Sequence, residues 1–303
     1  MYLGRFLFFV LIAELGSCLT LLELAQFKSR VYTESNTGVQ GFVRLSDTNL
    51  STYEIQSNGI PDHKTGKAAS KIEAQTYSIK LPTTPVFASA TTCLPDGPIG
   101  MAINGVPIFN PYSHDCCDKG KKRLDNLDEC WGLVDDLGRY HYMMTPACLF
   151  KLTCNNPSQL IGVAFDGFPI YGPNDETGRR ITKADLDACN GRYNRYRKYR
   201  YHITTEFPYT IGCFRGVPAP GYAGTCLCSN LTEPCPNQQP PNPSTPPASR
   251  KRRSVDTGIT SLTCCASANN CDHLYNDKSS ANTARTTLSF LLFTFTTALT
   301  LML

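Results

Sequence analysis

The chain has 303 residues, of which 41% are hydrophobic, and a formal net charge of +4 at pH 7. This hydrophobic content suffices for a sizeable core and excludes a disordered chain, and the small net charge gives no electrostatic reason to expect a nucleic-acid partner. The fifteen cysteines include no CxxC pairs at zinc-finger spacing, so they indicate folding in an oxidising, secretory compartment.

Residues 1–18 have the layout of a cleaved signal peptide. Arg5 precedes a hydrophobic run from Phe6 to Ala13, and small residues follow at Gly16 and Ser17. Because the run is too short to span a bilayer, a signal peptide is favoured over a membrane anchor.

The predicted domain covers residues 26–216, and its first part, residues 26–92, is polar and rich in Ser and Thr. The alternating pattern of Gln75–Leu81 predicts a strand. Asn49 begins an N-glycosylation sequon. The turn-forming cluster Ser57–His63 ends on a carboxylate and an imidazole side by side, and its plainest interpretation is a surface turn.

A thirteen-residue segment then occurs twice with similar sequence, as Ile99–Pro111 and as Ile161–Pro173. In each copy, hydrophobic runs flank a dipeptide, Asn104-Gly105 or Asp166-Gly167, that tolerates the positive φ angles of a tight two-residue turn. Each segment is therefore predicted to form a β-hairpin.

The similarity between the two copies continues downstream of each segment. Cys130 and Cys189 are each followed ten residues later by a Tyr-rich tetrad, Tyr140–Met143 in one copy and Tyr199–His202 in the other. We therefore predict an internal duplication. Its two copies span residues 99–148 and 161–213.

Turn signals are dense in this core and helix signals are weak. The predicted fold is mainly β: a disulfide-rich, internally duplicated β-hairpin domain with short helices. We expect those helices after Asp118 and around Ala184–Ala188.

The tetrads hold the residues that suggest a metal. Alternate side chains of a strand share a face, so His141 lies with Met143, and Arg200 lies with His202. If the two copies pack with approximate two-fold symmetry, these four side chains converge, and His63 can join them. Imidazole and thioether are ligands that suit copper.

The chain resembles the YHYH-domain family of secreted and surface proteins from about Tyr53 to Gly216. The resemblance rests on several motifs quoted from this sequence: Ser57-Asn-Gly-Ile-Pro-Asp-His63, Gly97-Pro-Ile-Gly100, Asn104-Gly-Val-Pro107, Asn110-Pro-Tyr112, Asp166-Gly-Phe-Pro-Ile-Tyr-Gly172 and Phe207-Pro-Tyr-Thr-Ile-Gly-Cys-Phe-Arg-Gly216. It implies an extracellular domain of unsettled molecular function, in which the paired histidines suggest metal binding. Both tetrads depart from Tyr-His-Tyr-His, because Met143 and Arg200 replace two histidines.

Arg200 changes how the tetrads are interpreted. A guanidinium stays charged at physiological pH and repels a nearby cation, so it favours an anion or a purely structural role. Buried Tyr and His with hydrogen-bonded polar tips are also ordinary core residues. Three interpretations stay open: structural tetrads, a metal site of His63, His141, Met143 and His202, or a site that binds an anion or another ligand.

The run Arg192–Arg200 interleaves basic and aromatic residues. Such a pattern can bind nucleic acid or sulfated glycans. In a secreted protein a glycan, or simply a solvated strand face, is favoured. The chain shows no nucleophile motif, phosphate loop or close carboxylate pair, which makes a binding protein more plausible than an enzyme.

The composition changes beyond residue 216. A Cys-containing extension, 217–233, includes a second sequon at Asn230, and a Pro-rich linker with a tetrabasic sequence, 234–253, follows it. Secretory convertases cut such basic sequences, so we expect cleavage after Arg253.

A Cys-containing tail, 254–282, leads to a hydrophobic segment, 283–303, in which residues 288–303 are apolar and carry no charge. The small residues before that segment favour a glycolipid-anchor signal over a spanning helix, which needs ~20 residues. The candidate attachment residues are Ser279, Ser280 and Asn282.

Cleavage after Cys18 leaves an even number of cysteines. Eight lie in the domain, and we expect them to pair among themselves: Cys93, Cys116, Cys117, Cys130, Cys148, Cys154, Cys189 and Cys213. The six cysteines beyond residue 216 lie three on each side of Arg253, so if they are fully oxidised and pair only among themselves, at least one disulfide crosses the cut.

These observations predict a protein of the cell surface, held to the outer leaflet of the plasma membrane by a lipid anchor. The leading function is a binding or matrix-associated module, with a glycan or the extracellular matrix as the possible partner. The alternative is a copper-binding protein or a metal-dependent enzyme that uses His141 and His202.

Overall fold

The computed structural model describes residues 19–49, 51–66, 71–113, 116–120, 126–149 and 156–225. The chain divides into two units, Met1–Lys251 and Arg252–Leu303, and every described residue lies in the first. The predicted signal peptide, linker, tail and anchor signal lie outside the described residues. So do these predicted site residues: Cys154, Asn230, Arg253, Ser279, Ser280 and Asn282.

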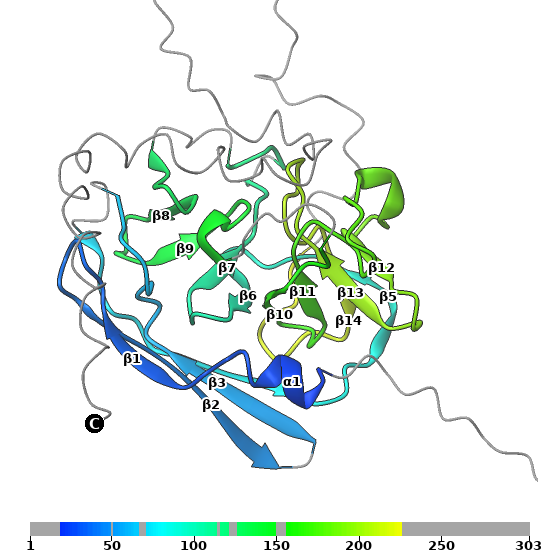
Figure 1. Ribbon diagram of the computed structural model, residues 1–303, viewed down its shortest axis with the longest axis horizontal. Coiled ribbons are helices and arrows are strands. Elements are labelled where there is room, and N and C mark those ends of the chain that lie inside the picture. Colours follow the sequence, from blue (N-terminus) through cyan, green and yellow to red (C-terminus); the bar gives the residue numbers. More distant parts are fainter. Residues whose placement is uncertain are drawn as a thin grey trace, which may run out of the picture. The chain divides into compact units, whose positions relative to one another are not determined.

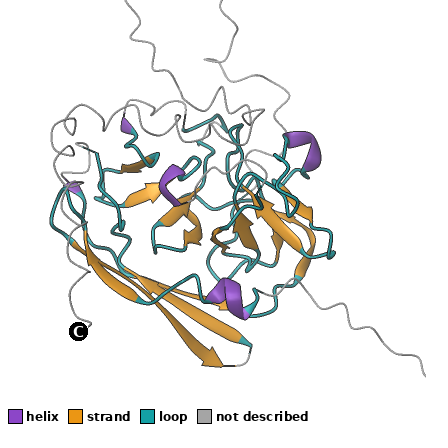
Figure 2. Cartoon of the chain, in the orientation of Figure 1, coloured by secondary structure: helices purple, strands orange, loops and turns teal. Residues whose placement is uncertain are grey.

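The fold is mainly β, as predicted, and its helices are short (Figures 1 and 2). The first strands are β1 (Arg30–Thr33), β2 (Gln40–Asn49), β3 (Thr52–Ser57), β4 (Tyr77–Pro82), β5 (Phe87–Thr92), β6 (Pro98–Ala102) and β7 (Pro107–Phe109). The remaining strands are β8 (Gly132–Val134), β9 (Tyr140–Tyr142), β10 (Leu160–Ala164), β11 (Pro169–Tyr171), β12 (Gly191–Tyr193), β13 (Tyr199–His202) and β14 (Phe214–Gly216). The helices are α1 (Leu21–Leu24), η3 (Ala147–Leu149) and η4 (Lys183–Asp185). No helix among the described residues is long and apolar enough to cross a membrane.

The first four strands form an antiparallel sheet in the order β1-β2-β3-β4. Side chains in β3 alternate between half-buried and buried, which places Tyr53 and Ile55 in the core. β4 overlaps the strand predicted over Gln75–Leu81 and buries Ile79 and Leu81. Asn49 is the last residue of β2, at the hairpin that leads to β3.

The main sheet has eight strands in the order β12-β13-β11-β10-β6-β7-β9-β8, and its two halves repeat one arrangement. Each half has an antiparallel hairpin next to the centre, β6–β7 or β10–β11. The second strand of that hairpin pairs in parallel with a tetrad strand, β9 or β13. The two halves meet where β6 and β10 pair in antiparallel fashion. This symmetry suits the predicted duplication, which itself stays a prediction.

The hairpin turns are one residue longer than the sequence suggested. Ala102 N–H donates to Val106 O, and Gly105 N–H donates to Ala102 O, so the loop holds the three residues 103–105. Within it only Gly105 has a positive φ, of 82°. The second hairpin repeats this pattern, with Gly167 at a φ of 88°. A turn followed by a left-handed glycine is the usual three-residue hairpin loop, and it needs only one such residue.

Short helices and disulfides complete the domain. The 3-10 helix η4 lies at the start of the predicted segment Ala184–Ala188, whereas residues 121–125, after Asp118, lie outside the description. Disulfides join Cys130, which precedes β8, to Cys148 in η3, and Cys189, which precedes β12, to Cys213. Three further predicted cysteines are also disulfide-bonded: Cys93, Cys116 and Cys117.

Candidate functional site

The first tetrad borders an open pocket of about 290 Å³. His141 in β9 and Met143, which directly follows this strand, both line it, as expected from the alternation of side chains. The other lining residues are Asp96, Gly97, Phe109, Lys119, Asp135 and Arg139. This volume is close to the lower end of ligand pockets, roughly 300 Å³, so the pocket fits one small group.

His141 presents a neutral imidazole to this pocket. Burial lowers its pKa to about 4, so the ring is uncharged at physiological pH. Its Nδ1–H donates to Arg139 O at 3.0 Å, which leaves the lone pair on Nε2. The ring stacks on Phe109 with centroids 4.0 Å apart, and the Arg139 guanidinium lies over the same Phe109 ring at 5.1 Å. The imidazole is therefore rigidly placed.

Two ion pairs of unequal strength charge the pocket wall. Arg139 contacts Asp135 at 2.7 Å; burial raises the pKa of Asp135, but hydrogen bonds from Arg139 outweigh it and hold that pKa below its usual range. Lys119 lies 3.4 Å from Asp96, whose side chain is 93% exposed. Exposed pairs of this kind contribute about 0–1 kcal/mol. Asp96 therefore holds Lys119 only weakly.

The second tetrad is occupied by its own side chains. Arg200 Nη2 donates to Glu176 at 2.7 Å, and its Nε donates to His202 Nε2 at 3.0 Å. His202 is fully buried, and its Nδ1–H donates to Gly172 O, so both ring nitrogens are engaged. Burial first, and then the Arg200 charge, lower the pKa of His202 to about 3. The guanidinium also lies 4.4 Å from the centroid of the Tyr171 ring. Arg200 is thus internally neutralised.

The structure places the predicted metal ligands in three settings. His141 and Met143 share the pocket, whereas His202 belongs to the Arg200 cluster on β13. Four strands lie between β9 and β13, each step being about 4.8 Å. His63 contacts Tyr142 and the Cys130–Cys148 disulfide instead. A metal site that uses His141 together with Met143 stays a prediction, and His202 offers it no free nitrogen.

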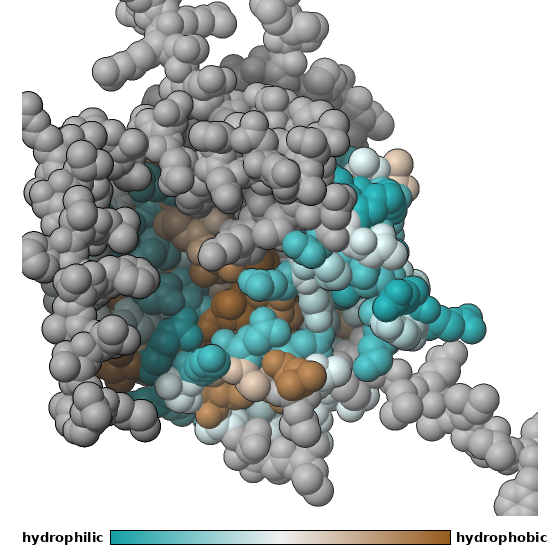
Figure 3. Space-filling model, in the orientation of Figure 1, coloured by the Kyte–Doolittle hydropathy of each residue, from teal (hydrophilic) through white to brown (hydrophobic). Residues whose placement is uncertain are grey.

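Sequence reasoning missed the charged residues of the pocket and the partner of Arg200. Asp135 and Arg139 flank the tight turn that leads into β9, and Glu176 lies far from Arg200 in the sequence. The i,i+4 spacing of Asp135 and Arg139 was an available signal. The Arg192–Arg200 run forms the β12–β13 hairpin, on a side of the domain where hydrophilic residues gather (Figure 3).

Residues 78–180 match the family model described as YHYH protein. The match includes the first tetrad and every residue that lines the pocket, and it ends before the second tetrad. No curated protein and no solved structure matches the chain. The chain therefore contains a YHYH domain, in agreement with the resemblance of its motifs.

Proposed function

We propose, from the YHYH domain in residues 78–180, that this protein is a cell-surface binding module whose first-tetrad pocket takes an acidic glycan unit. The observation that carries the proposal is a pocket lined by Lys119, Arg139 and His141, in which the lysine pairs, within the described part of the chain, with a weak, exposed carboxylate. A ligand carboxylate or sulfate would replace Asp96 at the lysine, and neutral His141 would accept a hydrogen bond from a ligand hydroxyl.

The two halves of the main sheet differ in whether the charged residues around their tetrads are paired inside the protein. In the second half, Arg200 pairs with Glu176 inside the protein, so the cation of the tetrad itself is not available to an external anion. In the first half, the neutral imidazole of His141 stands at the position that corresponds to Arg200, and the charged residues lie at the pocket wall. A binding role for the first tetrad and a structural role for the second follow from this difference.

The proposal is tested by applying the purified full-length protein to an array of neutral, carboxylated and sulfated glycans. We expect binding to acidic members alone, weakened by salt because the contact is electrostatic. Uniform binding to neutral glycans, or no binding to any member, would contradict the acidic-glycan assignment.

A second candidate is a copper protein, because His141 and Met143 line one pocket, and imidazole and thioether are ligands that suit copper. Elemental analysis of the purified protein separates the two. Stoichiometric copper that is lost in His141→Gln favours the copper protein, whereas the glycan proposal expects no stoichiometric metal.

The proposed attachment to the membrane is tested independently of the ligand. The hydrophobic segment 283–303 and the small residues before it are expected to direct lipid attachment near Ser279 to Asn282. Treating intact cells with a phosphatidylinositol-specific phospholipase should release the protein. Retention on the cells, with residues 283–303 still detected by mass spectrometry, would indicate a spanning helix.

A further inference from the structure

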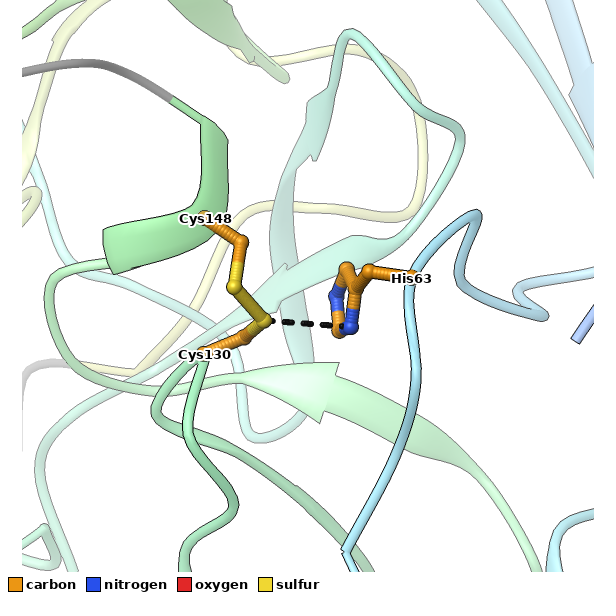
Figure 4. Close-up of side chains that lie close together, drawn as sticks. All are labelled: His63, Cys130 and Cys148. Carbon is orange, nitrogen blue, oxygen red and sulfur yellow. Dashed lines mark hydrogen bonds between the residues drawn. A yellow bond between two sulfur atoms is a disulfide. The ribbon is translucent and has the colours of Figure 1, made fainter. Parts of the chain in front are cut away.

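The Cys130–Cys148 disulfide lies against an imidazole. Cys130 is buried at the turn before β8, and Cys148 is exposed in η3. His63, in the loop between β3 and β4, places its Nδ1 3.1 Å from Cys130 Sγ (Figure 4). The two sulfurs therefore differ, since one faces solvent and the other faces a hydrogen-bonding ring.

The hydrogen bonds around His63 assign the ring proton. Asn104 Nδ2 donates to the Tyr142 hydroxyl at 3.1 Å, so the Tyr142 proton is available to His63 Nε2, which lies 2.7 Å away. With Nε2 accepting, the proton of a neutral ring is on Nδ1. That N–H faces Lys64 O at 3.2 Å and Cys130 Sγ. A charged ring would also carry a proton on Nδ1. Cys130 sulfur therefore has a hydrogen-bond donor in either form.

The second disulfide provides an internal comparison. At the position that corresponds to Asn104, Asp166 accepts the proton of Tyr201, so that tyrosine has none to give an imidazole. The ring nitrogens of His202 are bonded to Arg200 and Gly172. Among the described residues no imidazole donates to Cys189 or Cys213, and Cys189 is buried. This disulfide has the character of a structural cross-link.

We propose that Cys130–Cys148 is a thiol–disulfide exchange site whose substrate is an external dithiol. The thiolate of the dithiol attacks exposed Cys148 Sγ and forms a mixed disulfide, and the electron pair of the broken S–S bond leaves with Cys130 as a thiolate. The second thiolate of the dithiol then attacks the mixed disulfide and releases Cys148. The dithiol is oxidised to a disulfide, the protein disulfide is reduced, and the two protons of the dithiol pass to the protein cysteines.

His63 favours this direction of attack because it stabilises one leaving sulfur. Exchange is faster when the leaving thiolate is better stabilised and when the attacked sulfur is accessible. A hydrogen bond from Nδ1–H to the Cys130 thiolate is charge-assisted, and such bonds are roughly twice as strong as neutral ones. Attack on Cys130 would meet a buried sulfur and would release Cys148 without this donor.

The test is a timed reduction of the native full-length protein with dithiothreitol, followed by alkylation and mass spectrometry. We expect Cys130 and Cys148 to be alkylated at least about tenfold faster than Cys189 and Cys213, because both accessibility and leaving-group stability favour exchange there. His63→Ala should slow the first pair by about tenfold and leave the second unchanged.

The position of the mixed disulfide gives a readout that needs no variant. After brief treatment with glutathione, the adduct should be on Cys148, with Cys130 free to alkylate. Equal reduction rates for the two disulfides, or an adduct on Cys130, would overturn the proposal. If His63→Ala fails to fold, His63→Gln serves in its place, and the adduct position in the native protein still decides.

Discussion

Replacing Gly132 with alanine is expected to lower the free energy of unfolding by about 3 kcal/mol. A Cβ at this position would overlap the hydroxyl and ring of Tyr140, a side chain that is almost fully buried. The Tyr140 hydroxyl donates to Asp128 at 2.6 Å, and Asp128 also accepts from the backbone N–H of Cys130 and Gly132. Moving the ring would therefore break this network as well as crowd the core.

Denaturant unfolding of the full-length protein at pH 7.5 measures this effect. Gly191→Ala should cost a similar amount, because its Cβ would overlap Tyr199 in the same way and Tyr199 donates to Asp187. Gly38→Ala is the control without steric overlap, since its Cβ would meet nothing within 4 Å, and the positive φ of 74° at this position should cost about 1 kcal/mol. A Gly132→Ala protein as stable as the control would show that the ring has room to move.

Acidification from pH 8 to pH 5 is expected to destabilise the protein by about 3 kcal/mol. Burial lowers the pKa of His141 to about 4 and that of His202 to about 3, below the ordinary value of 6.5. The unfolded chain therefore binds more protons than the folded one as the pH falls below 6.5. Each histidine removes about 2 kcal/mol by pH 5.

One buried carboxyl acts in the opposite direction. Burial raises the pKa of Asp166 to about 6, so the folded state takes up this proton first and gains about 1 kcal/mol between pH 8 and pH 5. The two histidines together outweigh it. Carboxylates with a lowered pKa, such as Glu34 at about 2, stabilise the folded protein, and this stabilisation is lost only below about pH 4.5. They therefore do not contribute between pH 8 and pH 5.

Melting temperatures between pH 8 and pH 5 measure the balance. We expect a fall toward pH 5, and a shallower fall in His202→Gln, which removes one of the two titrating rings. Stability that is constant or rises toward pH 5 would mean that Asp166 dominates and that the histidines are charged in the folded state.

Much of the β scaffold could be predicted because it depends on local signals. Two hairpins follow from Asn104-Gly105 and Asp166-Gly167. Strands in the tetrads follow from Tyr at every second position, because Tyr fits a pleated surface. Turn length could not be predicted, because a three-residue loop with one left-handed glycine and a two-residue turn share the same dipeptide.

The contents of the site depended on contacts between distant residues. Glu176 neutralises Arg200 from 24 positions away, and His63 reaches Tyr142 across 79 positions. No local pattern indicates such pairings. The convergence of the tetrads was a symmetry argument, and the symmetry holds in the strand order, yet it places β9 and β13 in opposite halves of the sheet.

The most direct test of the proposed function is a binding titration with the acidic glycan that binds best on the array. Lys119→Ala removes the loosely paired cation of the pocket, and Arg195→Ala removes an exposed cation from the β12–β13 hairpin, the rival basic surface. We expect Lys119→Ala to weaken binding about tenfold, as the loss of one charge-assisted hydrogen bond does, and Arg195→Ala to leave it unchanged. If Arg195→Ala weakened glycan binding and Lys119→Ala did not, the result would contradict binding in the pocket and would place the ligand on the β12–β13 hairpin.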